Sequence, residues 1–192
     1  SAENDEMTWT DSAIAVGRMD GDLSTGAFPL GNYLILAKRT KVYRFDYDLD
    51  PNDDAQRALT VISEMRGLIA NRCAVVLEGT AYMMDQQPNY FWVTRGGALF
   101  PLDIGRAIRN KLDPGGDYEP DWSKSSCWFG WYSPIPKSIC WAFTLLGEDY
   151  PRFAAEYMAP NIEGSDEPGR WCIREYHHYI RGAVNAVGAD GV

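Results

Sequence analysis

The sequence predicts an α+β fold in which a small antiparallel sheet packs on one long helix and is extended by a second sheet and a C-terminal helix. Residues 42–51 alternate between bulky apolar and charged side chains, which is typical of a strand with one buried face. Residues 58–69 and 173–184 carry apolar side chains at three- and four-residue steps, which is typical of amphipathic helices. A strand pattern followed by a helical pattern favours a sheet covered by a helix.

The first strand and the long helix are expected to form one unit. Pro51 ends the strand because proline cannot donate to a β-ladder. Asp53 then opens the helix, with Gln56 three positions later completing a capping box. We expect the aromatic side of the strand to face the apolar stripe of the helix. The strand contributes Tyr43, Phe45, Tyr47 and Leu49, and the helix contributes Ala58, Ile62, Met65 and Ile69.

The other elements of the N-terminal half follow from alternation and from turn residues. Residues 1–26 are acidic and sparse in apolar periodicity, which predicts an N-terminal arm. A first strand over 28–36 is expected to pair with the strand over 42–49. After the helix, strands at 74–77 and 80–84 flank a turn at Glu78 and Gly79, and strands at 89–94 and 98–102 flank Gly96 and Gly97.

A loop over 113–120 divides the chain in this prediction. It contains two prolines, two adjacent glycines and three acidic residues, a composition typical of a surface connection. The division gives an α+β domain over 27–112 and a second region over 113–192. In the second region we expect strands at 127–132 and 139–146, a helix from Pro151 to 158, and a closing helix over 171–187.

Charge limits the class of partner. The 192 residues carry a formal charge of −9, which disfavours sequence-independent nucleic-acid binding because lysine and arginine supply most of that affinity. A basic protein partner suits this charge better. Positive residues nevertheless gather locally, and a solvated face is the ordinary interpretation of such groups. One group is Lys38, Arg39, Lys41 and Arg44, and the other is Arg95, Arg106, Arg109 and Lys111.

The four cysteines indicate a reducing environment. They lie at long spacings without a paired Cys-x-x-Cys motif, so the sequence predicts no zinc site and no other metal or cofactor. The chain has no run of 18 apolar residues and no signal-peptide pattern, and its first residues are acidic. We therefore expect an intracellular protein, cytoplasmic or nuclear, that does not contact a membrane.

The sequence offers no convincing catalytic constellation. His177 and His178 lie near Cys172 and Glu175, but neighbouring residues on a helix point about 100° apart and do not easily share one ion. No nucleophile has a recognisable base and orienting partner. We predict no enzymatic activity, with a Cys/His enzyme left as an alternative. The aromatic run Trp128, Phe129, Trp131 and Tyr132 is interpreted as core, with base stacking as its alternative.

The order of motifs resembles the N-terminal domain of the Argonaute family. That domain has an Asn-aromatic strand, a Tyr-x-aromatic-acidic strand ending at proline, a helix, and an acidic-Gly hairpin followed by tyrosine. The corresponding residues here are Asn32, Tyr33, Tyr43, Phe45, Asp46, Pro51, Glu78, Gly79 and Tyr82.

The region after residue 104 is similar to the first linker of Argonautes. In that linker a Gly-Arg pair precedes a Trp-aromatic-Gly-aromatic run, a Ser/Pro segment and an aliphatic strand that leads into an acidic residue and a phenylalanine. The matching residues are Gly105, Arg106, Trp128, Phe129, Gly130, Trp131, Ser133, Pro134, Pro136, Leu145, Leu146, Asp149 and Phe153.

The resemblance implies a non-catalytic role in small-RNA silencing, as a wedge in duplex loading and unwinding. The second sheet would then be linker-like, and the chain would be a fragment or a free-standing relative of the N-terminal lobe. A small RNA duplex, or the rest of an Argonaute-type complex, would be its partner. The RNA-contact candidates are Lys38, Arg39, Lys41, Arg44, Arg95 and Arg106. The alternative is an acidic protein-interaction or decoy module that has the same scaffold and does not bind RNA.

Overall fold

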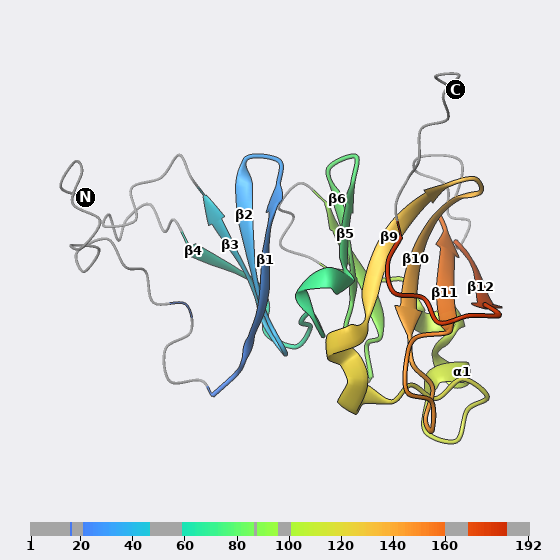
Figure 1. Ribbon diagram of the computed structural model, residues 1–192. Helices are drawn as coiled ribbons and strands as arrows, with labels where there is room; N and C mark the ends of the chain where they lie inside the picture. The colour runs from blue at the N-terminus through green and yellow to red at the C-terminus, as the bar shows by residue number, and fades with distance from the viewer. Residues whose placement is uncertain are drawn as a thin grey trace, which may run out of the picture.

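The computed structural model describes residues 16, 21–46, 59–86, 88–95, 101–159 and 169–183. These residues form three four-stranded sheets in which all the paired strands are antiparallel (Figure 1). The sheets follow one another along the chain, from the blue strands at one side of Figure 1 to the red strand at the other. The fold is therefore mainly β, and the predicted α+β class is wrong.

The first sheet is a meander of β1 (Ser24–Leu30), β2 (Tyr33–Lys38), β3 (Val42–Asp46) and β4 (Leu59–Ser63). The sequence predicted one strand over 28–36, but the chain turns at Gly31 and Asn32 instead. Gly31 has φ +59°, a left-handed conformation that glycine adopts at little steric cost. The turn converts the predicted single strand into the β1–β2 hairpin.

The predicted long helix is absent from the described residues, because β4 occupies the middle of its range. Three consecutive residues of this strand, Thr60, Val61 and Ile62, are β-branched, and β-branched side chains favour extended backbone. The helix prediction gave more weight to the spacing of the apolar residues than to this preference. Ile62 and Ile69 are buried, but the side chain of Met65 is 84% exposed, so the expected helical stripe does not exist as one face. Asp53, Gln56 and Ala58 lie outside the described residues.

The described part of the strand predicted over 42–49 is confirmed as β3, but its predicted inner face is only partly right. Val42 is fully buried and belongs to the core, although it lies on the same face as Arg44. Tyr43, on the other face, is also buried, whereas Phe45 is half-buried. Both faces of β3 are thus covered near its start; Tyr47 and Leu49 lie outside the described residues.

The second sheet contains the most accurate sequence prediction. A short 3-10 helix, η2 (Asn71–Cys73), leads into β5 (Ala74–Leu77), β6 (Thr80–Met84), β7 (Phe91–Arg95) and β8 (Leu102–Asp103). The hairpin between β5 and β6 has the predicted strand bounds. Its two turn residues, Glu78 and Gly79, have φ +48° and +70°, as a two-residue hairpin turn requires. Gly96 and Gly97 lie outside the described residues.

The third sheet follows three short helical segments, η3 (Gly105–Ala107), α1 (Arg109–Leu112) and η4 (Trp122–Cys127). It comprises β9 (Phe129–Pro134), β10 (Lys137–Phe143), β11 (Phe153–Met158) and β12 (Arg170–Glu175). The predicted helices over 151–158 and 171–187 are wrong, because β11 and β12 pair with each other from Phe153–Glu175 to Met158–Arg170. Residues 176–183 form no helix, and 184–192 lie outside the described residues.

One hydrophobic core connects the sheets. Trp141 of β10 is fully buried, and its ring centroid lies 4.7 Å from that of Phe91 in β7. Its indole Nε1 donates a 3.0 Å hydrogen bond to the carbonyl of Cys73. Trp128 is also fully buried, which confirms that the aromatic run contributes to the core. The core includes residues from both sides of the 113–120 loop; the division into two regions stays a prediction.

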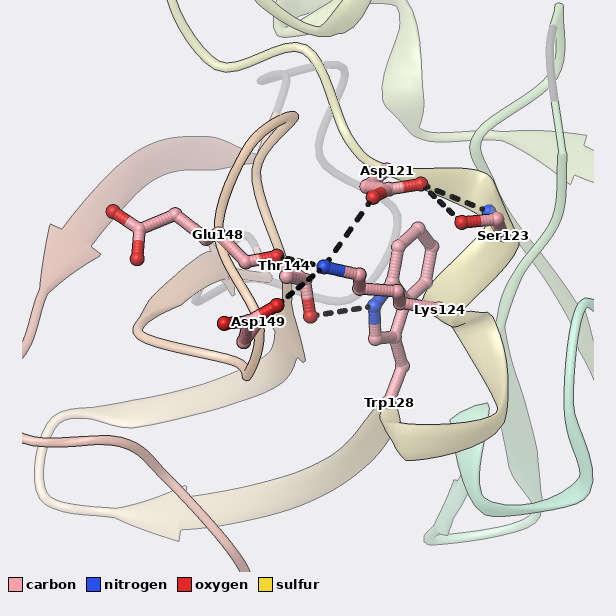
Figure 2. A network of polar contacts seen from close by, with 7 residues as sticks. All are labelled: Asp121, Ser123, Lys124, Trp128, Thr144, Glu148 and Asp149. Atoms are coloured by element: carbon pink, nitrogen blue, oxygen red, sulfur yellow. Dashed lines mark hydrogen bonds and ion pairs between the residues drawn. The ribbon is translucent and has the colours of Figure 1, made fainter.

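A polar network fixes η4 against the connection between β10 and β11 (Figure 2). Lys124 Nζ lies 3.1 Å from the carboxylate of Asp149 and also donates to the carbonyl of Glu148. Beneath it, the indole of Trp128 donates a 3.2 Å hydrogen bond to the hydroxyl of Thr144. Because the donors and acceptors of this network form hydrogen bonds and ion pairs with one another, we assign the network a structural role. No helix in the described part of the chain is both long and apolar enough to cross a membrane.

Candidate functional site

The basic hairpin is the strongest candidate site in the first sheet. We use this name for Lys38, Arg39, Lys41 and Arg44, which lie at the end of β2, in its connection to β3, and in β3 itself. The backbone amide of Lys38 donates a 2.8 Å hydrogen bond to the carbonyl of Lys41, which closes the turn. Four of the predicted contact residues are therefore brought together by one short hairpin.

The four side chains differ in exposure and surroundings. Lys38 is only 4% exposed, whereas the other three are half-buried. The guanidinium carbon of Arg44 lies 4.6 Å from the ring centroid of Tyr33, an arrangement that favours a cation–π contact. Arg39 Nε is buried and has no hydrogen-bond partner among the described residues. The hairpin thus combines positive charge with an aromatic face.

A segment that precedes β1 lies against the turn. The carboxylate of Asp22 accepts hydrogen bonds of 3.0 and 2.8 Å from the backbone amide and the hydroxyl of Thr40. The carbonyl of Leu23 accepts a 2.9 Å hydrogen bond from the amide of Arg39. A carboxylate of this chain therefore occupies donors at the turn, where an external anion would otherwise be attracted.

Lys38 also lines a pocket of about 380 Å³ between β1, β2 and η2, here named the hairpin pocket. The hydroxyl oxygen of Thr25, another lining residue, is buried without a partner among the described residues. A Cβ atom on Gly26 would lie 2.3 Å from Asn71 Oδ1, so glycine allows β1 to approach the pocket wall. The lining residues are Val16, Ser24, Thr25, Gly26, Ala27, Leu36, Ala37, Lys38 and Asn71. An ammonium, two hydroxyls and an amide suit a phosphate or a sugar hydroxyl.

The two other predicted contact residues do not belong to this hairpin. Arg95 is exposed at the end of β7, and Arg106 is exposed in η3. Both are in the segment from β5 to α1 rather than in the first sheet. The structure therefore joins four of the six candidates through one element and places the remaining two on separate elements.

Three of the four cysteines, Cys73, Cys140 and Cys172, are not activated as nucleophiles. Burial raises the pKa of the Cys73 thiol to about 12 and that of Cys140 to about 11. Burial also raises the pKa of Cys172, which donates a hydrogen bond to Glu156. Within the described ranges, no group of three or more His, Cys, Asp or Glu residues is arranged to hold a metal ion.

Sequence reasoning missed the polar wall of the hairpin pocket. Ser24 and Thr25 lie in the stretch predicted as an N-terminal arm, and Asn71 is more than 30 positions from Lys38. No local motif connects these residues, so only the pairing of β1 with β2 and the position of η2 reveal the site.

Models of known protein families and the curated proteins were both searched, and neither contains a match to this chain.

Proposed function

We propose that this chain is a non-catalytic, Argonaute-like N-terminal lobe that acts in small-RNA silencing, inside the cell in the cytoplasm or nucleus. It would contact a small RNA duplex through the basic hairpin and act as a wedge during loading and unwinding. The observation that carries the proposal is the position of Lys38, which is the last residue of β2 and the first of the basic hairpin, and which also lines the hairpin pocket. A phosphate at the pocket would therefore meet positive charge from the hairpin.

The chemistry of the hairpin supports contact with a nucleic-acid backbone. Lysine and arginine neutralise phosphates and release counterions, and an arginine beside an aromatic ring presents a surface on which a base can stack. Arg44 and Tyr33 provide such a pair. The formal charge of −9 opposes long-range attraction, so we expect weak binding that depends on a few local contacts.

An action by shape rather than by bond chemistry is consistent with the thiols. None of Cys73, Cys140 and Cys172 has a lowered pKa, and a thiolate is the reactive form of cysteine. A wedge requires only a rigid β-structure and a surface that follows the duplex. The continuous core provides that rigidity.

The test is a salt titration of binding to a fluorescently labelled short RNA duplex. We expect binding at low salt that weakens as salt rises, with a slope of about one per phosphate contacted. The double variant Arg39→Gln, Lys41→Gln should lower this slope by about two. The matched control is Lys137→Gln, Arg170→Gln, which changes two exposed residues of the third sheet. Equal loss in both variants, or no RNA binding at low salt, would refute the proposal.

A second candidate function is an acidic protein-interaction module that binds a basic partner and no RNA. It is favoured by exposed apolar side chains on and after the edge strand β4, where Val61 is 41% and Met65 84% exposed. In this case a lysine-rich peptide should bind while RNA does not, and the Val61→Gln, Met65→Gln variant should weaken peptide binding. RNA binding lost specifically in the hairpin variant would exclude this candidate.

A further inference from the structure

A second pocket lies beside the third sheet, lined by a residue just before β11 and by residues that follow β12. It has a volume of about 420 Å³, within the range of small-molecule sites. All its lining residues carry hydrogen-bond donors, and none is a carboxylate. They are Arg152, His177, His178, Tyr179 and Arg181, and we name this site the arginine–histidine pocket.

The backbone holds the two sides of this pocket together. The amide of Tyr176 donates a 2.9 Å hydrogen bond to the carbonyl of Arg152, immediately beyond the β11–β12 ladder. The amide of Ile180 donates a 2.7 Å hydrogen bond to the carbonyl of Pro151. The segment 177–179 is therefore fixed at both ends against the start of β11. A pocket formed in this way is largely organised before a ligand arrives.

The charges of the pocket are arranged to receive an anion. Arg152 Nη2 lies 3.2 Å from a carboxylate oxygen of Glu148 and 3.2 Å from one of Glu175, which orients the guanidinium and offsets its charge, so Arg181 is the cation that would face an anion. Arg152 Nε is buried without a hydrogen-bond partner in the described structure. Arg181, which is exposed, makes no ion pair with another described residue.

Two exposed tyrosines adjoin the cationic residues. The ring centroids of Tyr150 and Tyr179 are 5.3 Å apart. The two residues are 46% and 49% exposed. The guanidinium carbon of Arg181 lies 6.0 Å from the centroid of Tyr150. Aromatic rings beside a phosphate-binding group provide a face on which a nucleobase can stack.

We propose that the arginine–histidine pocket binds a phosphorylated nucleoside, with Arg181 and the two histidines at the phosphate and Tyr150 and Tyr179 beside the base. The ligand is a free nucleoside monophosphate or the phosphorylated end of an RNA strand, which present the same chemistry. The site does not depend on the basic hairpin, because no residue is common to the two.

The test uses the two histidines as reporters. The chain has only two, both in this pocket, so every imidazole signal in an NMR spectrum reports on it. We expect adenosine 5′-monophosphate to shift both signals. Adenosine alone and inorganic phosphate alone should bind more weakly, because each lacks one half of the contacts.

Two arginine variants distinguish binding in this pocket from a general effect of positive charge on the protein surface. Arg181→Gln should weaken nucleotide binding by about tenfold or more, as loss of a charged hydrogen bond does. Arg170→Gln, an exposed arginine on β12 outside the pocket, should leave binding within about twofold. Arg152 is not used because its two ion pairs give it a structural role. Thermal unfolding of each variant checks that the fold is retained.

The outcomes are distinct. Tighter binding of a 5′-phosphorylated dinucleotide than of the mononucleotide identifies a strand end as the source, and the reverse order identifies a free nucleotide. No shift of either imidazole signal at millimolar nucleotide would overturn the proposal. Equal losses in Arg181→Gln and Arg170→Gln would also overturn it. If the Arg39→Gln, Lys41→Gln variant does not change RNA binding, the proposed function is refuted and the nucleotide site is not affected.

Discussion

The hydroxyl of Ser138 donates a 2.6 Å hydrogen bond to the carboxylate of Glu156, which is only 3% exposed in the third sheet. The other carboxylate oxygen accepts hydrogen bonds from Cys172 Sγ at 3.2 Å and Arg174 Nη2 at 2.9 Å. Burial raises the pKa of Glu156, but these three donors outweigh burial and hold the pKa below its ordinary value. The ionised carboxylate therefore stabilises the sheet.

We predict that Glu156→Gln lowers the free energy of unfolding by about 1–3 kcal/mol at pH 7. A lowered folded-state pKa gives stability that is present above the ordinary pKa of glutamate and is lost as the pH falls through the folded-state value. The deficit of the variant should therefore shrink toward pH 3. Urea unfolding at both pH values measures it, with the exposed Glu64→Gln as the control. A deficit that is independent of pH would contradict the assigned role of the charge.

The strands of the third sheet show where sequence reasoning failed. Residues 153–158 follow a proline and include alanine, glutamate and methionine, which favour a helix locally. They form β11 because β10 and β12 pair with it on both sides, a non-local cause. The hairpin at Glu78 and Gly79 was predictable because its turn chemistry is contained in adjacent residues.

The same distinction applies to the sites. Lys38, Arg39, Lys41 and Arg44 are nearly contiguous, so their grouping was visible in the sequence. The hairpin pocket combines residues from β1, β2 and η2, and no spacing rule connects them. The arginine–histidine pocket was obscured for another reason, because a helix predicted over 171–187 would have pointed its two histidines in different directions.

Asp85 should give a pH dependence opposite to that of Glu156. Its carboxylate accepts hydrogen bonds from the amides of Gly67 and Gln86 and from Asn89, and it is only 1% exposed. Burial nevertheless dominates and raises the pKa of Asp85 to about 6. A raised folded-state pKa gives stability that is present below the ordinary pKa of aspartate and is lost as the pH rises through about 6.

We therefore predict that Asp85→Asn costs less stability at pH 7.5 than at pH 4.5. The difference between the two costs should be on the order of 2 kcal/mol, because asparagine removes the penalty for burying a charge. Denaturant unfolding of both proteins at each pH measures this difference. A cost that is larger at pH 7.5 would show that the carboxylate is stabilised in its ionised form.

Gly130 allows β9 to pack closely against β5, because it has no side chain. A Cβ atom at this position would lie 2.6 Å from Val75 Cγ2 and 3.0 Å from Trp141 Cδ1. We predict that Gly130→Ala lowers the free energy of unfolding by about 1–3 kcal/mol through overpacking. Gly182→Ala is the control, because no described residue other than its two chain neighbours has an atom within 4 Å of the added methyl group.

A double-mutant cycle tests the cause of this loss. Val75→Ala removes the nearest methyl group, so the cost of Gly130→Ala should be smaller in that background. Chemical unfolding of the four proteins gives the coupling free energy. Additive costs would locate the strain elsewhere than at Val75.

Asp22 should weaken anion binding by the basic hairpin. Its carboxylate is held at the turn by the amide and hydroxyl of Thr40, so a negative charge lies among the positive residues. We predict that Asp22→Asn raises RNA affinity at low salt by about threefold to tenfold, the effect of removing one nearby charge in water. Asparagine keeps an oxygen acceptor for Thr40, so the turn should be retained.

Fluorescence anisotropy with the labelled duplex measures the change in affinity. The control is Asp117→Asn, a substitution at an exposed position of the 113–120 loop that changes the net charge by the same amount. If both variants raise affinity equally, net charge alone is responsible and the basic hairpin is not the contact surface. If only Asp22→Asn does so, and the gain disappears above about 0.5 M salt as screening predicts, the RNA backbone lies at the turn.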